Sequence, residues 1–188
     1  MNKIQERRTF VALPLPTSFR EQLGEWIKET QKELPFRKWI HPQDIHITLH
    51  FLGSTSQEQL EETIQALRRV CQQQVPFELS IDGLGTFGKS DQPRIFWAGV
   101  RGQLDELRQL QKKVTTALTP IGFPPESRPY NPHITLARKY TSSDFDRSQL
   151  ASLHIGNFKW VVDRAVLYET ILGQGPMYHE IGTFSFVD

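Results

Sequence analysis

Two copies of one tetrapeptide carry the residue types that could move protons. They lie 87 residues apart and consist of His46, Ile47, Thr48 and Leu49, and of His133, Ile134, Thr135 and Leu136. In a β-strand, residues i and i+2 share a face. Each copy therefore turns its histidine and threonine to one face and its isoleucine and leucine to the other, towards an apolar core. If the two polar faces meet about an approximate two-fold axis, two imidazoles and two hydroxyls surround one point.

Two histidines around one substrate atom are suited to general acid–base catalysis. With an ordinary pKa near 6.5, one ring can accept a proton from a nucleophile while the other, protonated, donates to the leaving group. The hydroxyls of Thr48 and Thr135 can donate hydrogen bonds to anionic oxygens. Arg138, five residues after His133, adds a cationic fork that matches phosphate. The set favours a phosphodiester substrate and requires no nucleophilic side chain.

Each of these residues also has a structural interpretation. A single histidine on a strand is usually structural, Thr48 and Thr135 are good β-formers, and Arg138 could be a solvated surface charge. The duplication of the whole motif favours the catalytic interpretation of the two histidines.

A metal site is an alternative interpretation of the histidine cluster at 41, 46 and 50. His46 and His50 are four residues apart, a spacing that pairs metal ligands on a helix. The intervening Ile-Thr-Leu is typical of a strand, and no glutamate follows His46. We therefore expect neither a metal nor a cofactor, and we expect His154 and His179 to be structural.

The elements around the motifs repeat with the same 87-residue shift. The patterns predict strands at 9–13, 45–52, 77–85, 94–100, 134–137, 159–170 and 178–186, helices at 19–33, 58–72 and 103–118, and a short helical stretch at 145–153. Shifted by 87, the first strand falls on the fourth and the first helix covers most of the third. A repeated motif inside a repeated frame indicates internal duplication.

The duplication predicts an α+β fold with two pseudo-symmetric lobes. Each lobe is expected to be a small, mainly antiparallel sheet with helices on its outer side, and a cleft separates the two. No stretch resembles a flexible linker, so residues 1–188 are expected to form a single domain.

The positions of Phe51 and Arg138, each five residues after a motif histidine, impose one requirement on the strands. A regular strand would turn them away from the histidines, so a strand end, a twist or a bulge is needed.

Composition limits the function classes further. The chain has 188 residues, with 22 lysines and arginines against 21 acidic residues, for a net charge of +1. This balance argues against a protein that coats nucleic acid non-specifically, so any nucleic acid should be met at an end or at one nucleotide. The apolar runs are too short to span a bilayer, the N-terminus lacks an apolar signal segment, and Cys71 is the single cysteine. We expect a cytoplasmic monomer that contacts no membrane.

The motifs resemble those of the 2H phosphoesterases. The first copy continues as His50-Phe51-Leu52-Gly53 and the second as Ala137-Arg138. The similarity is closest to the RNA 2′,3′-cyclic phosphodiesterase branch, also called 2′-5′ RNA ligases. The opening segment 8–16 and the closing strands also fit that branch, so the resemblance covers essentially the whole chain.

The resemblance implies metal-independent hydrolysis of a 2′,3′-cyclic phosphate at an RNA 3′ end, giving a 2′-phosphate, together with a possible reverse ligase activity. In that scheme His46 protonates the departing 3′ oxygen and His133 takes a proton from the attacking water. Thr48, Thr135 and Arg138 would bind the phosphate.

Several alternatives remain open. Phe51 could stack on the terminal base or belong to the core, and Arg128 and Tyr130 could line the RNA path or simply form a loop. The same site could act on a small cyclic nucleotide such as ADP-ribose 1″,2″-cyclic phosphate. A non-catalytic RNA- or nucleotide-binding module is a third possibility, although a binder has no need of two proton carriers.

Overall fold

The computed structural model describes residues 6–187 and shows an α+β fold. Its strands are β1 (Arg7–Pro14), β2 (Phe36–Trp39), β3 (His46–Thr55), β4 (Phe77–Gly88), β5 (Pro93–Gly102), β6 (His133–Tyr140), β7 (Lys159–Val162), β8 (Arg164–Thr170) and β9 (Tyr178–Ser185). Its helices are α1 (Thr17–Thr30), α2 (Gln57–Cys71) and α3 (Leu104–Leu118), with short 3-10 helices at Pro42–Asp44, Thr119–Ile121 and Arg147–Ser152.

The strands form one path, β7-β4-β5-β6-β3-β1-β8-β9, with β2 added on β6. The path has an approximate two-fold symmetry, because the 87-residue shift carries β3 onto β6, β1 onto β5, and β4 onto β8. At the centre, β3 and β6 meet through the antiparallel pair Ile47 and Ile134. These two residues are themselves 87 positions apart, so the pseudo-two-fold axis passes between them and the two motifs flank it.

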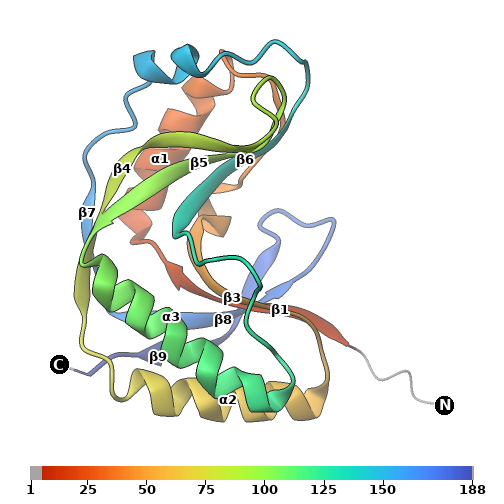
Figure 1. Cartoon of the computed structure of the whole chain (residues 1–188), viewed down its shortest axis with the longest axis vertical. Coiled ribbons are helices and arrows are strands. Elements are labelled where there is room, and N and C mark those ends of the chain that lie inside the picture. Colours follow the sequence, from red (N-terminus) through yellow and green to blue (C-terminus); the bar gives the residue numbers. More distant parts are fainter. Residues whose placement is uncertain (1–5, 188) are drawn as a thin grey trace.

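Two lobes meet at this centre (Figure 1). The β1 lobe contains β3, β1, β8 and β9, covered by α2 and α3, and the β5 lobe contains β2, β6, β5, β4 and β7, covered by α1. Helix α1 lies on the β5 lobe although it directly follows β1. Its Phe19 packs against Trp160 of β7 with 5.2 Å between ring centroids, and the ring centroid of its Trp26 lies 6.3 Å from that of Phe96 of β5. The duplicated halves of the sequence therefore exchange helices.

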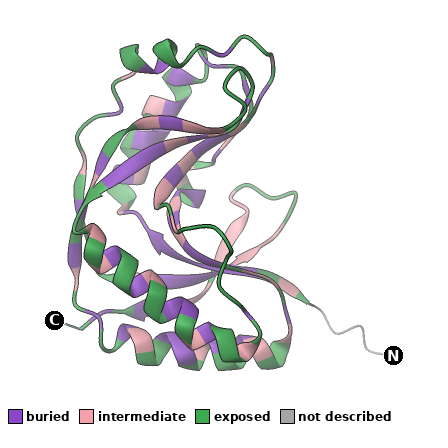
Figure 2. Ribbon diagram, in the orientation of Figure 1, coloured by how far each residue is buried: buried purple, intermediate pink, exposed green. Residues whose placement is uncertain are grey.

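Helical spacing of apolar residues explains why the helices lie where they do. Phe19, Leu23 and Ile27 of α1 are buried, as are Leu107 and Leu110 of α3, while the opposite faces are exposed (Figure 2). Such stripes bury one face of a helix against a sheet.

Helix α2 begins at a capping box. The Ser56 hydroxyl accepts a hydrogen bond from the backbone N–H of Gln59, whose side chain accepts one from the Ser56 N–H. Two donors that would otherwise lack partners at the helix start are thereby satisfied. Cys71, at the other end of α2, is buried and unpaired, and burial raises its pKa to about 12. This thiol is part of the hydrophobic core.

The prediction of one continuous strand over 159–170 is wrong. The chain breaks at Asp163 into β7 and β8, which pair with β4 and β1 respectively and so belong to different lobes. Both halves are rich in apolar and β-branched residues, and periodicity alone does not reveal that they belong to different lobes of the sheet.

Smaller differences are also present. The helical stretch expected at 145–153 is a 3-10 helix, β3 continues past Gly53 to Thr55, and the four-residue strand β2 was not predicted. Among residues 6–187, no helix is long and apolar enough to cross a membrane.

Candidate active site

The two motif histidines open the two central strands. His46 is the first residue of β3 and His133 the first residue of β6, and the residues after them, Ile47 and Ile134, are paired. Both rings are partly buried, and the charge of His133 acts on His46. The fold therefore brings together two imidazoles from distant parts of the chain.

Both rings are oriented by the same hydrogen bond. Nδ1 of His46 lies 2.6 Å from the carbonyl oxygen of Asp44, and Nδ1 of His133 lies 2.7 Å from that of Asn131. A carbonyl only accepts, so Nδ1 carries the hydrogen and Nε2 is left for the reacting groups. Nε2 of His46 lies 3.0 Å from the hydroxyl of Thr48. The two carbonyl partners are again 87 positions apart.

A bulge in each central strand reorients the residues that follow the motifs. Opposite β1, Thr48 pairs with Ala12 but Phe51 pairs with Phe10, so β3 contains one extra residue between them. Opposite β5, Thr135 pairs with Trp97 but Arg138 pairs with Ile95, which is the same irregularity in β6.

One extra residue shifts the alternation of side chains by one. Phe51 then shares the face of His46 and Thr48, and Arg138 shares the face of His133 and Thr135. The bulge that the five-residue offset required is confirmed in both copies.

Burial and Arg138 set the protonation of the two rings. Loss of solvent is the main reason that the pKa of His46 is lowered to about 4; the hydrogen bond and charge of Asp44 oppose this lowering, and the Arg138 charge adds a smaller contribution to it. Burial is also the main reason that the pKa of His133 is lowered, and Arg138 adds to it. Arg138 thus acts on both histidines at once. A phosphate anion between them would have the opposite sign and would raise both pKa values.

Aromatic side chains pack around both histidines. The ring centroid of Phe10 lies 4.9 Å from that of His46, and Tyr178 stands edge-on to the same imidazole at 5.3 Å. On the other side, Phe87 lies edge-on to His133 at 5.0 Å. Trp97, the counterpart of Phe10 in the repeat, lies 6.5 Å from His133. Sequence reasoning missed this set, although the 87-residue shift of Phe10 onto Trp97 was a usable signal.

A cleft of about 730 Å³ opens beside the histidines. Thr48 and His133 line it, as do Phe51, Arg128 and Tyr130. Phe51 is 57% exposed, so it lies at the mouth of the cleft and is not a core residue. The hydroxyl of Tyr130 donates to the backbone carbonyl of Thr48 at 2.9 Å, which ties the loop before β6 to β3.

The other three predicted residues lie outside the lining of this cleft. His46 packs against the Phe10 and Tyr178 rings, Thr135 pairs with Trp97, and Arg138 follows the β6 bulge. Thr135 and Arg138 are half-buried.

Asp44 links the first motif to the β8–β9 hairpin, a role that the sequence did not reveal. Its buried carboxylate accepts hydrogen bonds from the backbone N–H groups of Met177 and Tyr178, both at 3.0 Å. Since its carbonyl also holds Nδ1 of His46, Asp44 fixes both the imidazole and the Tyr178 ring beside it.

The metal interpretation of the first histidine cluster is not supported by the geometry. His50 pairs with Val11, a residue of the main core, and its Nε2 lies 3.3 Å from the carbonyl oxygen of Phe123. His41 caps the 3-10 helix at Pro42–Asp44 by accepting from the backbone N–H of Gln43. The part of the chain that the structure describes contains no group of three or more His, Cys, Asp or Glu side chains placed to hold a metal ion.

Comparisons with known proteins agree with this geometry. A family model described as the 2′-5′ RNA ligase superfamily matches residues 16–174. An RNA 2′,3′-cyclic phosphodiesterase of Geobacillus stearothermophilus is 36% identical over 176 residues, covering 93% of this chain; the chain spans only 56% of that relative's length. A protein of the same name from Bacillus subtilis is 32% identical over 177 residues, with 93% of this chain and 94% of the relative covered.

A solved structure is also similar over nearly the full length. The crystal structure of E. coli LigT complexed with 3′-AMP superposes with a TM-score of 0.79 at 25% identity, covering 98% of this chain and 100% of the other.

Proposed function

The chain belongs to the 2′-5′ RNA ligase superfamily, and from that premise we propose that it is an RNA 2′,3′-cyclic phosphodiesterase. The observation that carries the proposal is the pair of histidines that flank the pseudo-two-fold axis, each held by a carbonyl at Nδ1. Matched imidazoles with Nε2 available can donate one proton and accept another, which is what cleavage of a phosphodiester by water requires.

In the proposed reaction, His133 Nε2 takes a proton from a water molecule as its oxygen attacks the phosphorus. The bond from phosphorus to the 3′ oxygen breaks, and His46 Nε2 delivers a proton to that oxygen. The product is a 2′-phosphate beside a free 3′ hydroxyl. The two rings then hold exchanged protonation states, and proton exchange with solvent restores them.

Three further side chains are proposed to bind the phosphate. Thr48 and Thr135 donate hydrogen bonds to its non-bridging oxygens, and Arg138 supplies the compensating charge. This assignment is supported by the action of the Arg138 charge on both histidines. At the mouth of the cleft, the exposed ring of Phe51 offers a surface on which the terminal base can stack.

The partner of this site is proposed to be an RNA 3′ end, and E. coli LigT, solved with 3′-AMP, is a relative that binds a nucleotide. We propose that residues 1–188 act as one domain and as a monomer, because a single chain supplies both histidines. We also propose a cytoplasmic location, which is in keeping with a single cysteine.

The test is incubation with an oligonucleotide that ends in a 2′,3′-cyclic phosphate, with the position of the product phosphate read by phosphorus NMR. We expect a 2′-phosphate, and a 3′-phosphate would reject the assignment of the 3′ oxygen as the leaving group. ADP-ribose 1″,2″-cyclic phosphate in a parallel reaction tests the small-nucleotide alternative. If kcat/KM for that compound is far above the value for RNA, the small cyclic nucleotide and not RNA is the preferred substrate.

A further inference from the structure

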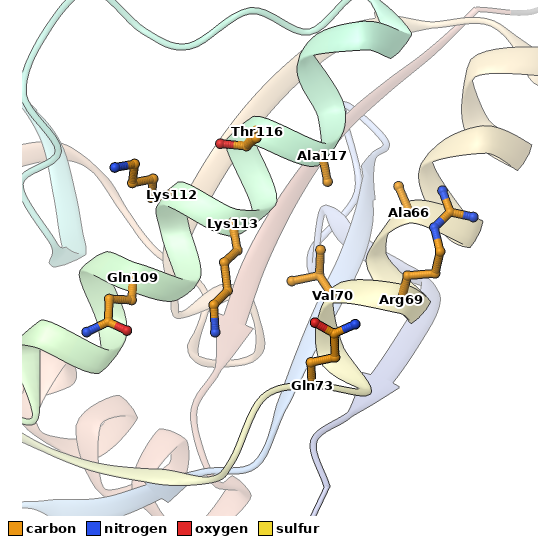
Figure 3. Close-up of a pocket in the computed structure, with 9 residues that line it drawn as sticks. All are labelled: Ala66, Arg69, Val70, Gln73, Gln109, Lys112, Lys113, Thr116 and Ala117. Atoms are coloured by element: carbon orange, nitrogen blue, oxygen red, sulfur yellow. The ribbon is translucent and has the colours of Figure 1, made fainter.

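A second hollow of about 530 Å³ lies between α2 and α3, away from the motif histidines. Its floor is apolar, formed by Ala66 and Val70 of α2 and by Ala117 of α3 (Figure 3). We call this hollow, with the side chains that border it, the α2–α3 groove. Its lining contains none of the residues assigned to catalysis or phosphate binding.

The groove is bordered by cations without acidic partners. Arg69 comes from α2, and Lys112 and Lys113 come from α3, while no aspartate or glutamate belongs to the lining. None of the three cations forms an ion pair with a carboxylate among residues 6–187. The chain as a whole is nearly neutral, so this local excess of positive charge favours an anionic partner.

The groove adjoins the catalytic cleft across one helix. Lys112 and Thr116 line both hollows, and Figure 3 shows their side chains on the side of α3 that is turned away from α2. Lys113 lies on the groove side of the same helix. An RNA strand that leaves the cleft across α3 would therefore pass Lys112 on the cleft side of the helix and Lys113 on the groove side.

We propose that the α2–α3 groove binds the RNA chain that precedes the terminal nucleotide. This inference rests on the proposed function, because it places the RNA body relative to an end bound at His46 and His133. Arg69 and Lys113 contact phosphates, and the apolar floor accepts a base or ribose face. A polyanion with alternating charged and flat apolar parts matches a groove that offers cations at its border and aliphatic carbons between them.

The experiment compares two substrates and two double variants. The substrates are 2′,3′-cyclic AMP, which ends within the cleft, and a single-stranded decamer with the same cyclic phosphate end. The groove variant carries Arg69→Gln and Lys113→Gln. The control variant carries Arg68→Gln and Arg108→Gln, which remove the same charge from exposed positions on the same helices outside the groove lining.

We expect the groove variant to raise KM for the decamer severalfold and to leave turnover of 2′,3′-cyclic AMP at the wild-type rate. The control variant should match wild type on both substrates. Affinity for a decamer with a 3′ hydroxyl, measured by fluorescence anisotropy over a range of salt, gives a second readout. Loss of two phosphate contacts should make the slope of log K against log salt shallower by ~1.4.

Other outcomes would overturn the inference. A groove variant with wild-type KM and salt slope on the decamers would exclude the groove from the RNA path. An equal loss in the control variant would show a general charge effect. If wild type hydrolyses neither substrate, the proposed function fails, but the anisotropy arm still judges the groove because it needs no turnover.

Discussion

Titration of the histidine pair offers the sharpest test of the proposed chemistry. Burial lowers the pKa of His46 to about 4 and also lowers that of His133 below its ordinary 6.5. At pH 7, a group with a pKa of about 4 is protonated in about one molecule in a thousand, which corresponds to about 4 kcal/mol. In the free protein at pH 7, His46 is therefore rarely in the protonated form that the proposed general acid requires.

The pH dependence of kcat/KM follows, because this parameter reports the free protein. One ring must be protonated and the other neutral, so kcat/KM should be bell-shaped with its maximum between about pH 4 and pH 6.5. Above that range it should fall about tenfold per pH unit. The maximum of kcat should lie at higher pH, since the bound phosphate anion raises both pKa values.

Arg138→Met provides the decisive perturbation. Its charge lowers both pKa values, so its removal should move the kcat/KM maximum to higher pH, besides weakening phosphate binding. Arg37→Met, an exposed cation on β2, is the matched control and should leave the maximum in place. Steady-state rates from pH 4 to pH 9, with the histidine resonances followed by NMR, measure both effects. A kcat/KM that is flat or rises from pH 6 to pH 8, or a maximum that Arg138→Met leaves unmoved, would refute the reasoning.

The same pKa predicts a dependence of stability on pH. The unfolded chain binds a proton at His46 near pH 6.5, whereas the folded chain binds it only near pH 4. The folded state therefore loses up to about 3 kcal/mol as pH falls through this window. Denaturant unfolding of wild type and His46→Asn at pH 7 and pH 4.5 should show a smaller loss in the variant.

Four other predictions can be tested with the same assays. His46→Asn and His133→Asn should each lower kcat by about 10²–10⁴-fold, measured with the cyclic-phosphate oligonucleotide; a rate within tenfold of wild type would reject the two-proton scheme. Excess EDTA should leave the rate unchanged, and a loss restored by one divalent ion would restore the metal interpretation. Asp44→Asn places an amide against two backbone donors, so denaturant unfolding should show a loss of about 1–3 kcal/mol together with a lower kcat, whereas unchanged stability would remove its anchoring role. Phe51→Ala should raise KM for RNA by the equivalent of about 1–3 kcal/mol of base stacking without changing kcat; an unchanged KM would exclude a base platform.

The sequence predicted the centre of the fold better than its periphery. The duplicated motif sufficed to place two strands side by side, because strand alternation fixes which residues share a face. The five-residue offsets of Phe51 and Arg138 even required the two bulges. These inferences used only local geometry and one exact shift along the chain.

Features that depend on long-range contacts were not predictable in the same way. Nothing near Asp44 in the sequence indicates that its carboxylate holds the backbone of Met177 and Tyr178. The break at Asp163 separates two strands of similar composition whose partners, β4 and β1, are far apart along the chain. In both cases the deciding energy comes from a partner more than 70 residues away.

The exchange of helices and strands between the repeats has a consequence for synthesis on the ribosome. When the first 90 residues have emerged, β1 and β3 lack β8 and α3, while α1 and β4 lack the sheet on which they pack. The β1 lobe is completed only after β9, the last of its strands in chain order, has emerged. The β5 lobe cannot form before β7 has emerged, nor the β1 lobe before β9, so a nascent chain exposes unpaired apolar strands to chaperones until these late segments are made.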